Sequence, residues 1–223
     1  MPLVLPGQEV RLNEPGRMFE RHHHLGAYAA LLVNGTCHET GDRGRYTATA
    51  GDVFVHRAFD GHGDRIGGLG AAFINIPLDL PLPYAFGRVT DLDAVVRAFE
   101  RSFADGCEQF QTLFEPAPAR SGDWPDLLAE ELESQRVSSL ADWSDAHGLH
   151  TTSVSRGFRL AYGVSPKRFR LEQMAARAAR RIRETAEGLG QIAAGCGFAD
   201  QAHMTRTIGR MFAVSPLELR RLS

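Results

Sequence analysis

The front of this chain is rich in imidazole side chains. Six of its nine histidines lie before residue 63: His22, His23, His24, His38, His56 and His62. Successive side chains of a β-strand point to opposite faces, so His22 and His24 would share one face of a strand. Two ligands of one metal ion require that arrangement, and so do two polar groups of one pocket. The histidines therefore predict a binding site in this part of the chain.

The last third of the chain carries a second set of chemically versatile side chains, on two predicted helices. Hydroxyl, amide, imidazole and guanidinium groups recur there at helical spacing: Thr152, Ser155, Arg156 and Arg159, then Gln201, His203, Arg206 and Arg210. Such groups bind base edges and phosphates in a DNA major groove. The alternative is two ordinary solvated helix faces.

A repeat of about 50 residues positions these two polar faces. Arg156 matches Arg206 at an offset of 50 residues, and Gly148 matches Gly197 at an offset of 49. A short predicted helix precedes each glycine and another helix follows it. Glycine can take the positive φ that a tight turn between two helices requires. This order of elements is that of a helix-turn-helix unit, present twice.

The helix after each glycine also has an apolar face. Val154 and Phe158 in the first copy, and Met204, Ile208 and Phe212 in the second, recur at i/i+4 spacing. We expect these side chains to be buried. Their burial would turn the polar faces outward.

A long helix is predicted between the two copies. Ser165 and Pro166 are a typical N-cap and first residue of a helix, and an apolar stripe continues from Leu171 to Ile182. A helix of about 18 residues is about 27 Å long, against about 34 Å between successive major-groove faces. We therefore expect one subunit to reach two neighbouring grooves. The other faces of this helix carry arginines that would reach phosphates or solvent: Arg168, Arg170, Arg177, Arg180, Arg181 and Arg183.

Charge is distributed unevenly along the chain, although the net charge is only −2. Residues 1–115 contain 10 basic and 15 acidic residues, whereas residues 150–223 contain 13 basic and 5 acidic residues. A block of net charge +8 beside an acidic front half predicts a polyanion-binding module joined to a domain of another kind.

Composition excludes several other classes of protein. The 223 residues are 43% hydrophobic and 23% charged, as in globular proteins, with no run that would span a bilayer. Residues 1–6 lack the features of a secretory signal, so a cytoplasmic location and no membrane partner are expected. Three cysteines without metal-ligand spacing, Cys37, Cys107 and Cys196, indicate neither a closed disulfide set nor a cysteine metal site.

The first half of the chain predicts a small β-barrel or sandwich. Short apolar or alternating runs at 28–33, 45–49, 52–56 and 71–76 are typical of strands, separated by turns such as residues 39–44.

The periodicity then becomes helical. One apolar stripe predicts a single helix that begins near Asp91 and packs on the barrel or on a second subunit: Leu92, Val95, Val96, Phe99 and Phe103. Residues 115–125 are rich in Pro, Gly and Ser and predict a linker, after which the chain is helical. We therefore expect two domains, residues 1–118 and 119–223, in an α+β protein: a β-barrel followed by an all-α domain whose two helix-turn-helix motifs are joined by a long helix.

Residues 126–223 resemble the paired helix-turn-helix domain of the AraC family of bacterial transcription regulators. The matching stretches include residues 156–159 (RGFR), 163–166 (GVSP) and, most specifically, 197–203 (GFADQAH). The resemblance implies sequence-specific binding to double-stranded promoter DNA, with recruitment or exclusion of RNA polymerase.

Several residues depart from this family's pattern. His150, Ser144 and Gly188 replace its usual residues, and so does Ile208 in the second copy. Gly157 and Gly209 lie inside the predicted recognition helices, where each costs about 1 kcal/mol relative to alanine. We therefore expect the second copy to bind DNA more weakly than the first.

The pattern His22-x-His24, then Gly51-Asp52, then His62 resembles the cupin pattern of sensor domains in AraC-type regulators. In metal-binding cupins a His-x-His pair, a nearby glutamate and a later histidine point into the barrel. The resemblance implies a cupin-like barrel in which His22, His24 and His62 are candidate ligands of a divalent metal.

The glutamate of that ligand set is missing from its expected place, where Tyr28 and Ala29 stand. The set is incomplete unless Glu20, His56 or Asp64 substitutes. The alternative is an organic-effector pocket, with or without metal, lined by polar residues that include His22, His24, His56 and His62.

Three functions compete at this point. The first is a transcription regulator, not an enzyme, that binds promoter DNA in response to a small-molecule effector. The second is a cupin-type metal-dependent enzyme with secondary DNA binding, and the third is an architectural DNA binder. The incomplete ligand set and the lack of another nucleophile or acid–base motif favour the regulator. The 92–103 stripe would serve as its interface in a homodimer.

Overall fold

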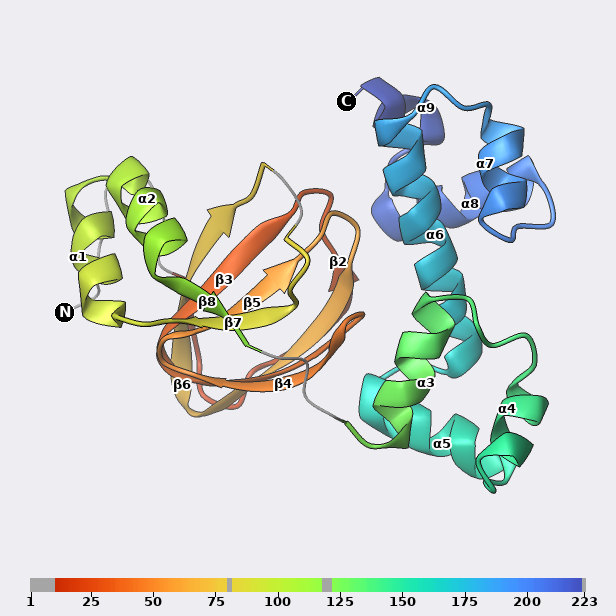
Figure 1. Cartoon of the computed structure of the whole chain (residues 1–223), viewed down its shortest axis with the longest axis horizontal. Coiled ribbons are helices and arrows are strands. Elements are labelled where there is room, and N and C mark those ends of the chain that lie inside the picture. The colour runs from red at the N-terminus through yellow and green to blue at the C-terminus, as the bar shows by residue number, and fades with distance from the viewer. Residues whose placement is uncertain (1–10, 80–81, 118–121, 222–223) are drawn as a thin grey trace.

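The computed structural model describes residues 11–79, 82–117 and 122–221. They form an N-terminal antiparallel sheet, here the sheet unit, and a C-terminal group of helices, here the helical unit, packed side by side (Figure 1). This arrangement confirms the expected α+β organisation with the helices last. Among the described residues, no helix combines the length and apolar character needed to cross a membrane.

The sheet unit is an eight-stranded antiparallel sheet in the part of the chain that is described. Its strands run in the spatial order β1-β6-β3-β5-β7-β8, with β2 paired to β6 and β4 paired to β3. The strand bounds are β1 Arg11–Asn13, β2 Met18–His23, β3 Tyr28–Gly41, β4 Gly44–Thr49, β5 Asp52–His56, β6 Gly61–Pro77, β7 Phe86–Val89 and β8 Phe114–Pro116.

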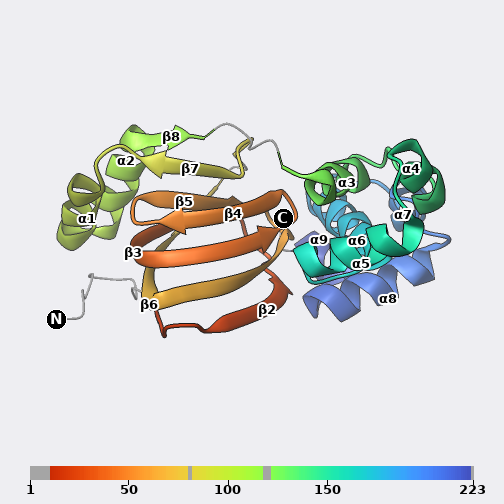
Figure 2. The same ribbon diagram turned by 90° about the horizontal axis from the view of Figure 1, so that it is seen from below.

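The sheet curls around an interior, because its long strands β3 and β6 bend along their length (Figure 2). Apolar side chains on the inner face, such as Leu32, Phe54 and Ile66, form one buried cluster. The opposite face buries Leu31 and Val53 in a second cluster. Alternation along each strand thus gives the sheet two apolar faces.

Two short helices cover that second face, and here one prediction is wrong. The stripe from Leu92 to Phe103 is divided between α1 (Leu92–Arg101) and α2 (Phe103–Leu113). Ser102 is extended, ends α1, and accepts a hydrogen bond from the Asp105 backbone N–H as the N-cap of α2. The break lets both helices pack on the sheet.

The helical unit contains the two predicted copies. Its helices are α3 Trp124–Glu133, α4 Leu140–Ala146, α5 Thr151–Tyr162, α6 Pro166–Glu184, α7 Leu189–Gly195, α8 Gln201–Phe212 and α9 Pro216–Arg221. Gly148, between α4 and α5, has a φ of +64°, and Gly197, between α7 and α8, has a φ of +86°. Both glycines therefore take the predicted positive φ.

The apolar faces of α5 and α8 are buried as predicted. Val154 and Phe158 are 0% exposed in one cluster, and Met204 and Ile208 are 0% exposed in another. Between the clusters runs α6, which has 19 residues and begins with Ser165 as its N-cap. Figure 2 shows α5 and α8 on the same side of α6. The two copies therefore present their second helices on one side of a common axis.

Candidate functional site

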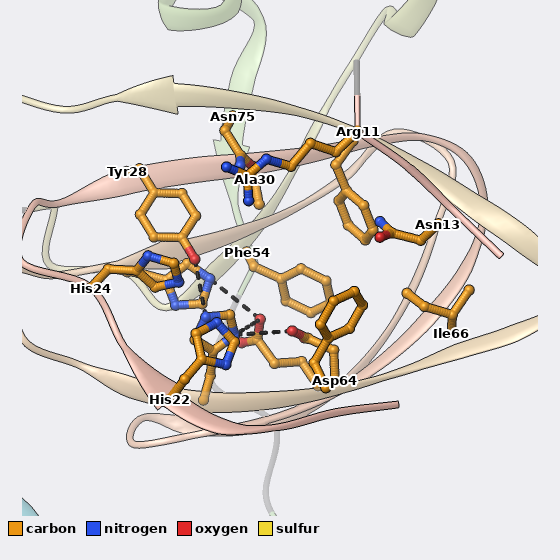
Figure 3. A pocket seen from close by; sticks show the side chains of 15 residues that line it. Arg11, Asn13, His22, His24, Tyr28, Ala30, Phe54, Asp64, Ile66 and Asn75 are labelled. Atoms are coloured by element: carbon orange, nitrogen blue, oxygen red, sulfur yellow. Dashed lines mark hydrogen bonds and ion pairs between the residues drawn. The ribbon is translucent and has the colours of Figure 1, made fainter. Parts of the chain in front are cut away.

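The inner face of the sheet encloses a small cavity of about 130 Å³, lined by both polar and apolar side chains. His22 and Asp64 lie on one side of it, and Arg11 and Asn75 lie on the other (Figure 3). All four predicted histidines, His22, His24, His56 and His62, line this cavity, together with aromatic rings such as Phe54. Sites for drug-sized ligands usually exceed about 300 Å³. The cavity therefore suits an ion or a molecule of few heavy atoms.

A buried carboxylate joins two of the histidines. Glu39 Oε2 lies 3.3 Å from His56 Nε2 and 3.2 Å from His62 Nδ1, and all three side chains are at most 7% exposed. Asp64 Oδ2 lies 3.4 Å from the same nitrogen of His62. The Tyr28 hydroxyl shares a hydrogen bond of 3.1 Å with His62 Nε2. His62 is therefore the centre of the polar cluster.

These contacts shift the pKa values of the cluster. Burial alone would lower the pKa of His62, but the Glu39 and Asp64 carboxylates outweigh it and raise that pKa to about 10. The pKa of Glu39 lies well below its ordinary value, because the neighbouring His56 and His62 outweigh the effect of burial. Burial, assisted by the other histidines, lowers the pKa of His24 to about 4. The cluster thus combines a cationic imidazole, an anionic carboxylate and a neutral imidazole.

The donors also fit a divalent metal ion. The ligand atoms of His22, His24 and His62 lie within 4.8 Å of one another, and so do those of Glu39, His56 and His62. Among the described residues, His56 Nε2 and His62 Nδ1 have no partner of hydrogen-bond geometry, although both are buried. Imidazole and carboxylate are ordinary ligands of Zn²⁺ and related ions. A metal held here would supply Lewis acidity or a fixed positive charge.

The carboxylate was missed at the sequence level because residues 39–44 were predicted to be a turn. In the structure β3 continues to Gly41, and only Asp42 and Arg43 separate it from β4. Cys37 and Glu39 thus alternate with the exposed His38 as strand residues, and both are buried. The alternation of residue types from Cys37 to Glu39 was the sequence signal that the strand continues. Asp64 lies beside Glu39, whereas Glu20 is exposed and offers only its backbone carbonyl, to His22 Nδ1.

The predicted DNA-contacting residues lie on α5 and α8. Six of them are exposed, and Ser155 and His203 are half-buried: Thr152, Arg156, Arg159, Gln201, Arg206 and Arg210 make up the exposed set. Within the described part of the chain, none of the four arginines of this set forms an ion pair. Their guanidinium groups are therefore free to meet phosphates or base edges. The N-cap of α8 is Asp200, which accepts from the His203 backbone N–H at 2.6 Å.

The arginines of α6 do something else, because they bind protein groups. Their acceptors are Glu172 for Arg168, Ser138 O for Arg170, Glu133 O for Arg177, Asp60 and Ala58 O for Arg180, Glu187 for Arg181 and Leu25 O for Arg183. Arg180 and Arg183 cross to the sheet unit. Arg168 and Arg170 are exposed, as expected for solvated side chains, whereas the other four arginines are half-buried; contact with phosphates stays a prediction.

Comparisons with known proteins match part of this chain. A family model described as a helix-turn-helix domain matches residues 143–222. The transcriptional activator RhaR of Mannheimia succiniciproducens is 31% identical over 81 residues, which are 36% of this chain and 29% of that protein. Residues 143–222 are therefore similar to a helix-turn-helix domain, and the chain spans less than a third of the length of this relative.

Solved structures give weaker likenesses to this chain. An AraC-type regulator from Chromobacterium violaceum is 25% identical, with a TM-score of 0.42 over 46% of this chain and 95% of that one. The Vibrio cholerae protein ToxT, solved with an unsaturated fatty acid, is 11% identical, with a TM-score of 0.43 over 95% of this chain and 96% of that one. With such TM-scores, the helix-turn-helix assignment of residues 143–222 depends on the sequence matches alone.

Proposed function

We propose that this chain is a transcription regulator that binds promoter DNA sequence-specifically and responds to a small-molecule effector. The observation that carries the proposal is the match of residues 143–222 to a helix-turn-helix domain, with α5 and α8 on one side of α6. Promoter DNA and RNA polymerase are the partners of such a protein, and the bacterial cytoplasm is where it would act.

In this proposal each helix-turn-helix motif places its second helix in a major groove. Thr152, Ser155, Arg156 and Arg159 contact one groove, and Gln201, His203, Arg206 and Arg210 contact the next. The connecting helix α6 of 19 residues is about 28 Å long. Residues 119–223 would form this domain, and a homodimer would bring four such helices to DNA; the apolar stripe of α1 and α2 is not its interface, because it packs on the sheet of the same chain.

The sheet unit, residues 1–118, would be the cupin-like sensor barrel. His22, His24, His56 and His62 would bind the effector, and Glu39 would supply the carboxylate that the sequence pattern lacks. A divalent metal would be held by His22, His24 and His62 or by Glu39, His56 and His62. The volume of about 130 Å³ limits an organic effector to a molecule of few heavy atoms.

Selection of duplexes from a random DNA library by the full-length protein tests the DNA-binding proposal. We expect a consensus of two half-sites about one helical turn apart, bound more than about 10³-fold more tightly than unrelated DNA. A double variant with Arg156→Ala and Arg206→Ala should lose this preference. Arg97→Ala, an exposed arginine of α1, is the matched control. A preference below about 10-fold would instead favour an architectural DNA binder.

Titration of metal-free protein with Zn²⁺, followed by calorimetry and elemental analysis, tests the metal version of the pocket. We expect one equivalent to bind and His62→Ala to abolish binding. His38→Ala is the matched control, because this exposed histidine bonds to Thr47 Oγ1 outside the cavity. Absence of stoichiometric metal in the unmodified protein would leave the organic-effector pocket as the proposal.

A further inference from the structure

Strand β2 belongs to two sites at once. His22, and His24 directly after the strand, line the cavity of the sheet unit. Arg21 and His23, which alternate with them, contact the helical unit. The pairing of β2 with β6 shifts register between Phe19 and His22. Because Phe19 and His22 both line the cavity despite being three residues apart, this irregularity changes which face Arg21 occupies.

Arg21 connects the sheet to the connecting helix. Its Nε donates to Glu172 Oε2 of α6 at 2.7 Å, and its Nη2 donates to Asp42 of the sheet unit. The Arg21 side chain is 8% exposed, that of Glu172 3% and that of Asp42 0%. Arg168 Nε donates to the other oxygen of Glu172 at 2.6 Å. Buried charges of this kind tolerate little displacement, because a lost partner leaves the remaining charge unpaired.

His23 reaches the second recognition helix. Its ring lies edge-on to Phe212, the last residue of α8, with centroids 5.4 Å apart. Its Nε2 also lies 4.0 Å from Glu172. Arg21 and His23 of β2 therefore contact α6 and α8. These two helices set the position of the second copy relative to the first.

The pocket side of the strand is packed in a similar way. The His22 ring lies 4.5 Å from the His62 ring and 4.8 Å from the His24 ring, measured between centroids. An occupant that binds these imidazoles therefore contacts side chains carried by β2 and by the residue directly after it. The backbone that carries them also carries Arg21 and His23.

We propose that β2 transmits changes at the cavity to the DNA-binding elements, through Arg21 to α6 and through His23 to α8. This inference rests on the proposed function, since it names how the effector pocket would regulate DNA binding. Displacement of His22 moves the register irregularity, and Arg21 and His23 then reposition Glu172 and Phe212. Binding at the imidazole cluster would thus change the spacing between α5 and α8.

A double-mutant cycle tests the coupling without any knowledge of the effector. His22→Ala perturbs the pocket side, and Glu172→Gln keeps the size of the α6 side chain but removes its charge. The readout is the Kd for a duplex selected by the unmodified full-length protein. We expect His22→Ala to change this Kd by a factor between about 5 and 150, the usual range of coupling between sites. In the Glu172→Gln background the same substitution should change Kd less than about 2-fold.

Glu133→Gln provides the matched control background. Glu133 Oε1 accepts from Arg57 Nη2 at 2.5 Å, so it also joins the two units, but it does so away from β2. The effect of His22→Ala should persist there. Equal effects of His22→Ala in the unmodified and Glu172→Gln backgrounds would overturn the proposal, as would no effect in either. Phe212→Leu gives a second cycle through the His23 contact if Glu172→Gln fails to fold.

Hydrogen exchange of the free protein separates this inference from the proposed function. His22→Ala should accelerate amide exchange in the first turns of α6 and the last turn of α8, and Glu172→Gln should remove the acceleration in α6. If no duplex is selected, the proposed function fails, and exchange alone decides the coupling. Unchanged exchange in His22→Ala would refute it.

Discussion

Two glycines, Gly157 inside α5 and Gly209 inside α8, make a matched pair for one quantitative test. In α5, a Cβ added to Gly157 would lie 2.5 Å from Cζ2 and 2.8 Å from Cη2 of Trp124. In α8, a Cβ added to Gly209 would meet nothing closer than Val214 O at 4.0 Å. Alanine should therefore be accommodated at Gly209 but not at Gly157.

The expected magnitudes follow from two opposing effects. Replacing an interior helical glycine by alanine stabilises the helix by about 1 kcal/mol. Overpacking of a filled contact costs about 1–3 kcal/mol. Gly209→Ala should thus raise the free energy of unfolding by about 1 kcal/mol, while Gly157→Ala should lower it by up to about 2 kcal/mol or leave it unchanged.

Urea unfolding followed by fluorescence and circular dichroism measures both variants. The chain's two tryptophans, Trp124 and Trp143, lie in α3 and α4, so fluorescence reports the first copy and circular dichroism reports all helices. Equal stabilisation by the two substitutions would refute the reasoning, because the Trp124 ring would then be free to move away. Destabilisation by Gly209→Ala would contradict the assumption that this position is open.

Three other outcomes are expected. Arg156→Ala or Arg206→Ala should each weaken specific DNA binding by about 1–3 kcal/mol in fluorescence anisotropy; unchanged footprints in both would remove these residues from the interface. Phe158→Ala should cost about 3–5 kcal/mol in urea unfolding, because its ring is 0% exposed. The free energy of unfolding should fall as the pH rises from about 6.5 to about 10, because Glu39 and Asp64 keep a proton on folded His62 that unfolded His62 has lost. His62→Gln should flatten that slope, and a slope of the opposite sign would mean that folded His62 is neutral.

Local patterns predicted the helical unit well, because its signals are short-range. Glycine at a turn, serine before proline and apolar spacing act within a few residues, and positive φ at Gly148 and burial of Phe158 followed from them. The prediction of a single helix from Leu92 to Phe103 was wrong because the apolar spacing continues across the N-cap of a second helix. Ser102 followed by Asp105 was the local signal for it.

The candidate site was predicted only in part, because its remaining contacts join distant segments. Glu39 reaches the histidine cluster because β3 continues to Gly41. The sequence pattern predicts a strand only over residues 28–33, which ends before Glu39. Arg180 and Arg183 of α6 looked available for DNA because their partners in the sheet unit, Asp60 and Leu25, lie 120 and 158 residues away. Periodicity gives the face of a helix that a side chain occupies, but not what covers that face.

Phe59 belongs to the sheet unit by sequence but packs in the core of the helical unit. Its side chain is 0% exposed, and its backbone φ is +69°. It belongs to the apolar cluster of the second copy, where the centroids of the Phe59 and Phe212 rings lie 5.1 Å apart. A non-glycine residue holds such a backbone conformation only where its surroundings enforce it. The sheet unit thus contributes a side chain to the interior of the helical unit. Replacing the sheet unit by that of another protein would leave a cavity there, unless the incoming unit carried an aromatic residue at the same turn.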